Sequence, residues 1–137
     1  MRTQPTRLFG LALVLGLVVA SARGAAHHSF SAEFDANKPL KLKGKLTEVK
    51  WVNPHSWIYI EVMGKNGTPE KWAWETAGIN NLYRQGWKKA DLVLGTILVI
   101  DGFQARSGAR VANASTITLE DGRRLFAGSP APTGARK

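Results

Sequence analysis

The sequence predicts an all-β domain with one short helix, a small five-stranded barrel of the OB-fold-like class. Several short stretches carry alternating apolar residues or β-branched runs, and turn-forming residues separate them. Between the third and the fourth of these stretches, the apolar spacing changes to that of a helix. Three strands, a helix and two strands is the element order of the OB fold. Another small β-barrel or a sandwich is the alternative.

The first strand is expected over residues 40–51. Leu40 and Leu46 fall on one face of an alternating pattern, whereas Val49 and Trp51 fall on the other. A strand that changes face midway usually contains a bulge or a bend. We expect this irregularity at Gly44, because glycine inside a strand often marks such a position.

The second strand is expected over residues 56–62 and the third over residues 70–76. Asn66 and Gly67 lie between them, and Asn-Gly suits the positive φ angles of a tight hairpin turn. The two strands are therefore predicted to pair as a hairpin.

A short helix over residues 78–87 follows from apolar residues at helical spacing, with Gly86 as its C-terminal cap. The two remaining main strands are expected over residues 95–105 and 111–119. A tight turn then leads into a short additional strand over residues 123–126.

The N-terminal region has the pattern of a secretory signal peptide. Arg2 and Arg7 precede an apolar run from Leu8 to Ala20, and small residues follow it. This run is too short for the roughly 20 residues that cross a bilayer as a helix. We expect a cleaved signal peptide over residues 1–26, no transmembrane segment after cleavage, and a periplasmic or secreted protein. The absence of cysteine excludes a lipoprotein anchor.

Two cleavage sites fit the small-x-small rule. Cleavage after Ala22 would leave Arg23 as the first residue, and cleavage after Ala26 would leave His27. We favour the second, because the charged Arg23 then stays on the removed side.

The remaining chain is long enough for one domain with a single core. Without cysteine, that core and not disulfide bonds must hold the fold. We expect a lead-in over residues 27–38, the barrel over 39–127 and a disordered tail over 128–137, since the tail is rich in Ala, Gly and Pro.

The chain after residue 26 carries 16 basic and 10 acidic residues, a net charge of +6. Such a charge attracts the protein to anionic surfaces and polymers. Lys41, Lys43 and Lys45, however, alternate with other residues in the way that is typical of a solvated strand face. We therefore favour the solvated-face interpretation and do not expect nucleic acid as a partner.

All three histidines lie in two short segments. His27 and His28 follow the expected cleavage site, and His55 lies between two predicted strands. Neutral imidazoles suit copper, zinc and nickel, and planar nitrogen sets favour Cu(II). These three residues are our candidate metal ligands, and Glu33 and Asp35 are carboxylates that could add an oxygen ligand or orient an imidazole.

Cleavage decides how many nitrogen atoms the N-terminus offers. If His27 is first, its amine and imidazole can chelate one ion, and His55 could supply an opposing nitrogen. If cleavage follows Ala25, the amine, two amides and the imidazole of His28 could surround Cu(II) or Ni(II) in a plane. The alternative is structural: the adjacent histidines are a disordered polar start, and His55 caps a turn.

An aromatic face is the second candidate site. OB folds usually bind ligands over their second and third strands. Four aromatic residues fall on these strands: Trp57, Tyr59, Trp72 and Trp74. Exposed, they could stack on a sugar, a peptide or a partner protein. The alternative is that the tryptophans pack in the core or cap the barrel.

Several motifs of the chain resemble one known family. The motifs are His27-His28-Ser29-Phe30, Glu33-Phe34-Asp35, Trp51-Val52-Asn53-Pro54-His55-Ser56-Trp57, Trp72-Ala73-Trp74-Glu75, Arg84-Gln85-Gly86-Trp87 and Asp121-Gly122-Arg123-Arg124-Leu125-Phe126. Together they are similar to a family of small secreted bacterial proteins that carries only a domain-of-unknown-function label. The resemblance implies export and supplies no catalytic residues.

The sequence favours a binding protein over an enzyme. It contains no Gly-x-Ser-x-Gly elbow, no phosphate-binding loop and no His-Glu-x-x-His motif. Copper redox chemistry on glycans, supported by a histidine brace, is the minority alternative. The two hypotheses are a metal-binding exported protein that uses the histidines, and an interaction module that uses the aromatic face.

Overall fold

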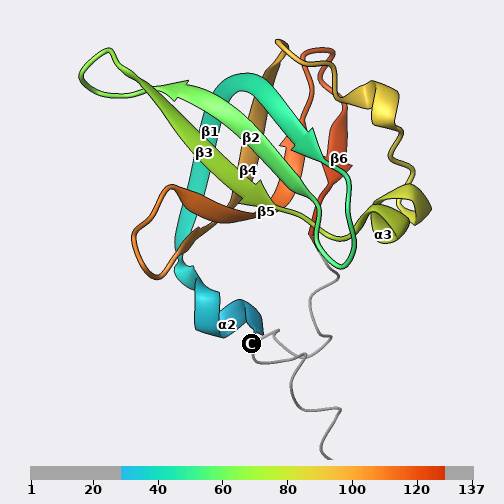
Figure 1. Cartoon of the computed structure of the whole chain (residues 1–137), viewed down its shortest axis with the longest axis horizontal. Helices are drawn as coiled ribbons and strands as arrows, with labels where there is room; N and C mark the ends of the chain where they lie inside the picture. Colours follow the sequence, from blue (N-terminus) through green and yellow to red (C-terminus); the bar gives the residue numbers. More distant parts are fainter. Residues whose placement is uncertain (1–28, 129–137) are drawn as a thin grey trace, which may run out of the picture. The chain divides into compact units, whose positions relative to one another are not determined.

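The computed structural model describes residues 29–128 (Figure 1). Its elements in chain order are α2 (Ser29–Glu33), β1 (Phe34–Lys50), β2 (Trp57–Met63), β3 (Pro69–Glu75), α3 (Ile79–Arg84), the 3₁₀ turn η1 (Lys89–Asp91), β4 (Ile97–Ala105), β5 (Val111–Thr118) and β6 (Arg124–Phe126). The predicted order of three strands, a short helix and two strands is confirmed, and so is the short additional strand.

Five strands close into a ring. The antiparallel order is β3-β2-β1-β4-β5, and a parallel pairing of β3 with β5 joins the two ends of this series. β6 pairs with the last part of β5, at residues 116–118. The closed ring agrees with the OB-fold-like barrel that the sequence predicts (Figure 1).

β1 serves two neighbours and changes face between them. Its first part pairs with β4 as far as Lys45, and its last part pairs with β2 from Lys45 onward. The register shifts between Leu46 and Glu48, so the bulge that the change of face predicts is present. It lies at Thr47 and not at Gly44. At Gly44 a side chain would begin 2.6 Å from the Glu61 carbonyl oxygen, so this glycine permits close approach of β2.

The strand begins earlier than expected. β1 starts at Phe34, within the segment expected as an irregular lead-in. Phe34 is buried and pairs with Ala105, and the Arg106 N–H donates to the Glu33 carbonyl. The first strand therefore starts at Phe34 and not at residue 40 as expected, because an apolar anchor at Phe34 extends it. The expected signal peptide of 1–26 and nearly all of the expected tail lie outside the described residues.

The core fills the ring from alternate positions of its strands. Its fully buried members include Leu46, Ile58, Ile60, Trp74, Leu82, Leu98, Ile100 and Ile117. Ile58 and Ile60 pair in register with Trp74 and Trp72, so these side chains share the inner face of the hairpin.

α3 and the segment after it are fixed against the core. Gly86 follows the helix with a φ of 90°, as expected of a cap, and Trp87 donates its indole N–H to the Phe126 carbonyl at 2.8 Å. The Trp51 and Trp87 rings pack edge to face, with their centroids 6.2 Å apart. In residues 29–128 no helix has the length and apolar character needed to cross a bilayer.

Candidate metal-binding site

The loop between β1 and β2, residues 51–56, is fixed by hydrogen bonds within itself. Ser56 is buried, and its hydroxyl donates to the Val52 carbonyl at 2.9 Å while it accepts from the Val52 N–H at 3.2 Å. The Asn53–Pro54 peptide bond inside the loop is cis. The two ends of the loop are thereby held together at its base.

A second set of hydrogen bonds fixes this loop to the segment that follows β3. Ile79 donates its N–H to the Val52 carbonyl at 3.1 Å, and the hydroxyl of buried Thr76 donates to the Ser56 carbonyl at 3.2 Å. Gly78 leaves no room for a side chain, because a Cβ there would lie 2.5 Å from the Pro54 carbonyl oxygen. The loop that carries His55 therefore has a defined position on the barrel.

His55 lies against a buried carboxylate. Its Nδ1 atom is 3.2 Å from Oε1 of Glu75, the last residue of β3. The Glu75 side chain is only 11% exposed, whereas the imidazole is 45% exposed. Since Nδ1 faces the carboxylate, Nε2 is the ring nitrogen that can bind a ligand from solvent. A carboxylate on one ring nitrogen is the usual support of a metal-binding histidine.

Three effects act on the pKa of the Glu75 carboxyl. Burial raises the pKa of the Glu75 carboxyl above its ordinary value, because the charged form loses hydration. The His55 imidazole opposes this rise in pKa, and the charge of Glu33 adds to it. Glu33 therefore lies close enough to act on the His55–Glu75 pair.

The two predicted accessory carboxylates differ in their placement. Glu33 is exposed at the end of α2 and acts electrostatically on Glu75. Asp35 instead accepts a hydrogen bond from the Asn37 N–H at 3.0 Å, a local turn contact. Of the two, only Glu33 has an interaction with the pair that the structure describes.

Within residues 29–128, no three histidine, cysteine or acidic side chains converge in a way that could hold a metal ion. His55 and Glu75 therefore form at most part of such a site. His27 and His28 lie outside the described residues, so the three-histidine site stays a prediction.

Comparison with known protein families gives a match to this chain. Residues 14–114 match the model of a family of unknown function, DUF6152. The chain belongs to this family. The resemblance to an uncharacterised family is thus confirmed. No curated protein matches the sequence.

The matched range of this DUF6152 member includes all three histidines, Glu33, Asp35 and Glu75, and also β1 to β4. The Asp121–Phe126 motif lies beyond that range. The family description carries no function, so the role of the site must come from its chemistry.

The DUF6152 barrel does not bring the four predicted aromatic residues onto one face. Trp74 is completely buried in the core, and Trp72 packs against the core from the same inner face. Trp57 and Tyr59 lie on the opposite, outer face of β2, because side chains alternate along a strand. The inclusion of Trp74 in a ligand face is therefore wrong, and Trp57 and Tyr59 remain as the reduced aromatic face.

The outer face of β2 joins this reduced face to the metal-site candidate. Trp57 pairs in register with Glu75 on one side and with Lys50 on the other. Tyr59 lies beneath two ammonium groups, with Lys50 Nζ 5.1 Å and Lys71 Nζ 4.6 Å from the ring centroid. Both lysines also pair with the Glu48 carboxylate.

Glu75 is the site residue that the sequence analysis missed. Its position could be obtained from the hairpin, because Trp57 and Glu75 are equally distant from the turn at Asn66. That symmetry places Glu75 beside the residue that follows the His55 loop. The burial of its carboxylate depends on neighbouring strands and has no local sequence signal.

Proposed function

We propose that this protein is an exported small binding protein. It binds a divalent metal ion, with a preference for copper, through histidine nitrogens at the β1–β2 loop. The observation that carries the proposal is the 3.2 Å contact between His55 Nδ1 and the buried Glu75 carboxylate. Glu75 orients the imidazole and keeps its proton on Nδ1, so that Nε2 is the coordinating atom. Glu75 is a positioning residue in this arrangement.

His27 and His28 supply the other nitrogen ligands in this proposal. Glu33, which acts on Glu75, is five residues after His28 in the sequence. Residues 29–33 form α2, so this stretch spans only about 8 Å at the helical rise of about 1.5 Å per residue.

The proposed preference for copper follows from the ligand types. The sequence contains no cysteine, so thiolate sites for zinc or Cu(I) are excluded. An N-terminal amine with two or three imidazoles gives an all-nitrogen set, which suits Cu(II). The signal pattern of Arg2, Arg7 and the run from Leu8 to Ala20 supports a periplasmic location.

Titration of the processed protein with Cu(II) tests the proposal. We expect a dissociation constant of micromolar or below in the wild type, and loss of this binding in His55→Ala and in His27→Ala. Glu75→Gln should weaken binding by roughly 10-fold to 100-fold, the usual effect of losing a carboxylate behind a ligating histidine.

A matched control separates positioning from loss of charge. Glu61→Gln removes an exposed carboxylate from β2, outside the His55–Glu75 pair. Its Cu(II) affinity should equal that of the wild type. Binding that survives both histidine substitutions, or no binding by the wild type, would overturn the proposal.

The mass of the protein purified from the periplasm tests its N-terminal part. A mass that corresponds to a chain starting at His27 means that one residue offers both an amine and an imidazole. A mass that corresponds to a chain starting at Ala26 favours the planar alternative with His28. A mass that still includes residues 1–26 contradicts cleavage and removes the amine from the site.

A second candidate is an interaction module that uses Trp57 and Tyr59. These half-buried rings lie on the outer face of β2, the region where OB folds usually bind ligands. A neutral and a sulfated oligosaccharide are suitable probes in metal-free protein. Quenching of tryptophan fluorescence that disappears in Trp57→Phe would support this function, and no quenching by either sugar would count against sugar binding.

A further inference from the structure

The loop between α3 and β4 leaves two aliphatic side chains outside the core. Val93 is 57% exposed and Leu94 is 63% exposed, directly after the η1 turn. Their neighbour Leu92 is buried and anchors the loop to the barrel. The loop therefore presents Val93 and Leu94 from a fixed base.

Two lysines of β1 adjoin this loop and the strand that follows it. Lys45 pairs in register with Ile97, and Lys43 pairs with Val99. The Lys45 Cε atom lies 4.0 Å from the position that a Cβ would take on Gly95. The lysine stems thus lie beside the loop and beside two partly exposed β-branched residues of β4.

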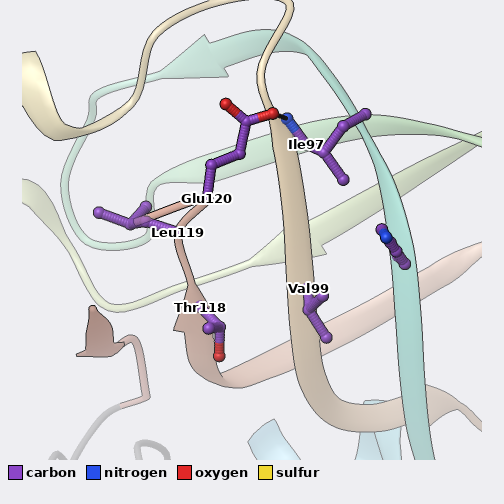
Figure 2. A pocket seen from close by; sticks show the side chains of 6 residues that line it. Ile97, Val99, Thr118, Leu119 and Glu120 are labelled. Carbon is purple, nitrogen blue, oxygen red and sulfur yellow. Dashed lines mark hydrogen bonds between the residues drawn. The ribbon is translucent and has the colours of Figure 1, made fainter. Parts of the chain in front are cut away.

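An open hollow lies beside β4, and Figure 2 shows side chains that line it. It has a volume of about 330 Å³ and is lined by Lys43, Ile97, Val99, Thr118, Leu119 and Glu120. Glu120 turns one oxygen to the backbone, where it accepts the Ile97 N–H at 2.9 Å (Figure 2).

Lysines outnumber acidic residues on this surface, where Glu120 lines the hollow and Glu61 lies in register with Lys45. In the part of the chain that the structure describes, Lys43 and Lys45 take part in no ion pair. Asp91, by contrast, is paired with Arg123 at 2.9 Å. Two exposed lysines, Lys88 and Lys89, begin the same loop.

We propose that Val93 and Leu94, together with Lys43 and Lys45, form a surface that docks onto an anionic phospholipid bilayer. Aliphatic side chains at a loop tip can enter the interfacial region while lysine stems carry their charges to the headgroups. Each lysine near an anionic surface contributes roughly fivefold in affinity. The surface uses no residue of the candidate metal site.

A bilayer fits this surface better than a protein partner does. Protein interfaces are enriched in aromatic residues and arginine and are depleted of lysine at their centres. They also bury roughly 800 Å² on each partner, which two aliphatic side chains cannot supply. Two apolar groups within a set of lysines match the composition of an interfacial membrane anchor.

Co-sedimentation of the processed protein with vesicles tests the proposal. We expect binding to vesicles of phosphatidylglycerol and phosphatidylcholine, weak binding to phosphatidylcholine alone, and release as salt is raised. The double variant Lys43→Gln/Lys45→Gln should bind roughly 10-fold to 30-fold more weakly. The double variant Val93→Ser/Leu94→Ser should lose roughly tenfold or more.

Matched controls come from the β2–β3 turn. Met63 is 67% exposed and Lys65 is also exposed, so Met63→Ser/Lys65→Gln removes similar groups elsewhere. This variant should bind like the wild type. Equal losses in the control and the test variants would assign binding to net charge and overturn the proposal, as would no binding to anionic vesicles. The test variants could instead lose binding to a periplasmic protein while their vesicle binding stays unchanged. That result would assign the surface to a protein contact and would also overturn the proposal.

Discussion

The two loops of this barrel, residues 51–56 and residues 88–96, are held by different contacts. The first is hydrogen-bonded to a separate segment, through Ile79 and Thr76, and its His55 faces a buried carboxylate. The second is joined to β1 at its end, where Gly95 donates its N–H to the Leu46 carbonyl at 2.8 Å, but its tip carries Val93 and Leu94 in solvent. A loop that must hold one ring at one distance needs support from another element. A loop that presents side chains to solvent needs such support at its base and not at its tip.

The largest effect should come from filling the space between the first loop and its support. Gly78→Ala places a Cβ 2.5 Å from backbone oxygen of Pro54, which cannot yield as a flexible side chain can. We expect the free energy of unfolding to fall by about 1–3 kcal/mol. Urea denaturation measures this change. Leu94→Ala in the second loop is the control, and a loss as large as that of Gly78→Ala would contradict the comparison.

One side-chain hydroxyl in each loop hydrogen-bonds to the backbone of the same loop. Removing each hydroxyl in turn tests how well the two loops are supported. Ser56 bonds both backbone groups of Val52 and is buried, whereas Thr96 donates to the Val93 carbonyl at 2.8 Å near solvent. Ser56→Ala should cost about 1–2 kcal/mol because it leaves polar groups poorly hydrated. Thr96→Ala should cost less, since water can replace its bond. Equal values from thermal or urea unfolding would mean that the loops are equally well supported.

The pH dependence of stability should report the burial of Glu75. Its pKa is raised in the folded protein, so the folded state binds its proton more tightly than the unfolded state does. The contribution of Glu75 to stability is therefore full below its ordinary pKa of 4.5 and is lost as the pH rises through the raised value.

Glu75→Gln removes this dependence. The unfolding free energy of the variant, minus that of the wild type, should increase as the pH rises through that window. Urea unfolding at several pH values measures the difference. A difference that stays constant from pH 4 to pH 7 would show that Glu75 is not buried as described.

The smallest effect should come from the tip of the second loop. Val93→Ser/Leu94→Ser should change the unfolding free energy by no more than about 0.5 kcal/mol per residue, because neither side chain is packed. Thermal unfolding measures this, with Leu92→Ser as a contrasting variant, since Leu92 is buried. Destabilisation by the tip substitutions comparable to that of Leu92→Ser would show that the tip packs against the barrel.

The sequence predicts the barrel well because its signals are local. The hairpin follows from Asn66-Gly67, the helix end from Gly86 and the bulge in β1 from the change of face after Leu46. The boundary at Phe34 was missed because its partner, Ala105, is 71 residues away. Strand pairings over such distances leave no pattern near either residue.

The candidate site could be predicted only in part. His55 was found because histidine is rare in this chain, but Glu75 is one of ten acidic residues and nothing local distinguishes it. Alternation separates Trp57 from Trp74 only once one face is known to be the interior. Which face is buried depends on closure of the ring, and that is a property of all five strands together.

The pairing of β3 with β5 closes the ring through only three register pairs, from Ala73 with Val111 to Glu75 with Asn113. This is the shortest of the seams that join neighbouring strands of the ring, so it is where local opening of the barrel would begin. Glu75 ends that seam, and His55 lies against it. A ligand bound by this pair would therefore stabilise the closed ring. The free energy of ring opening would rise with the logarithm of the ligand concentration.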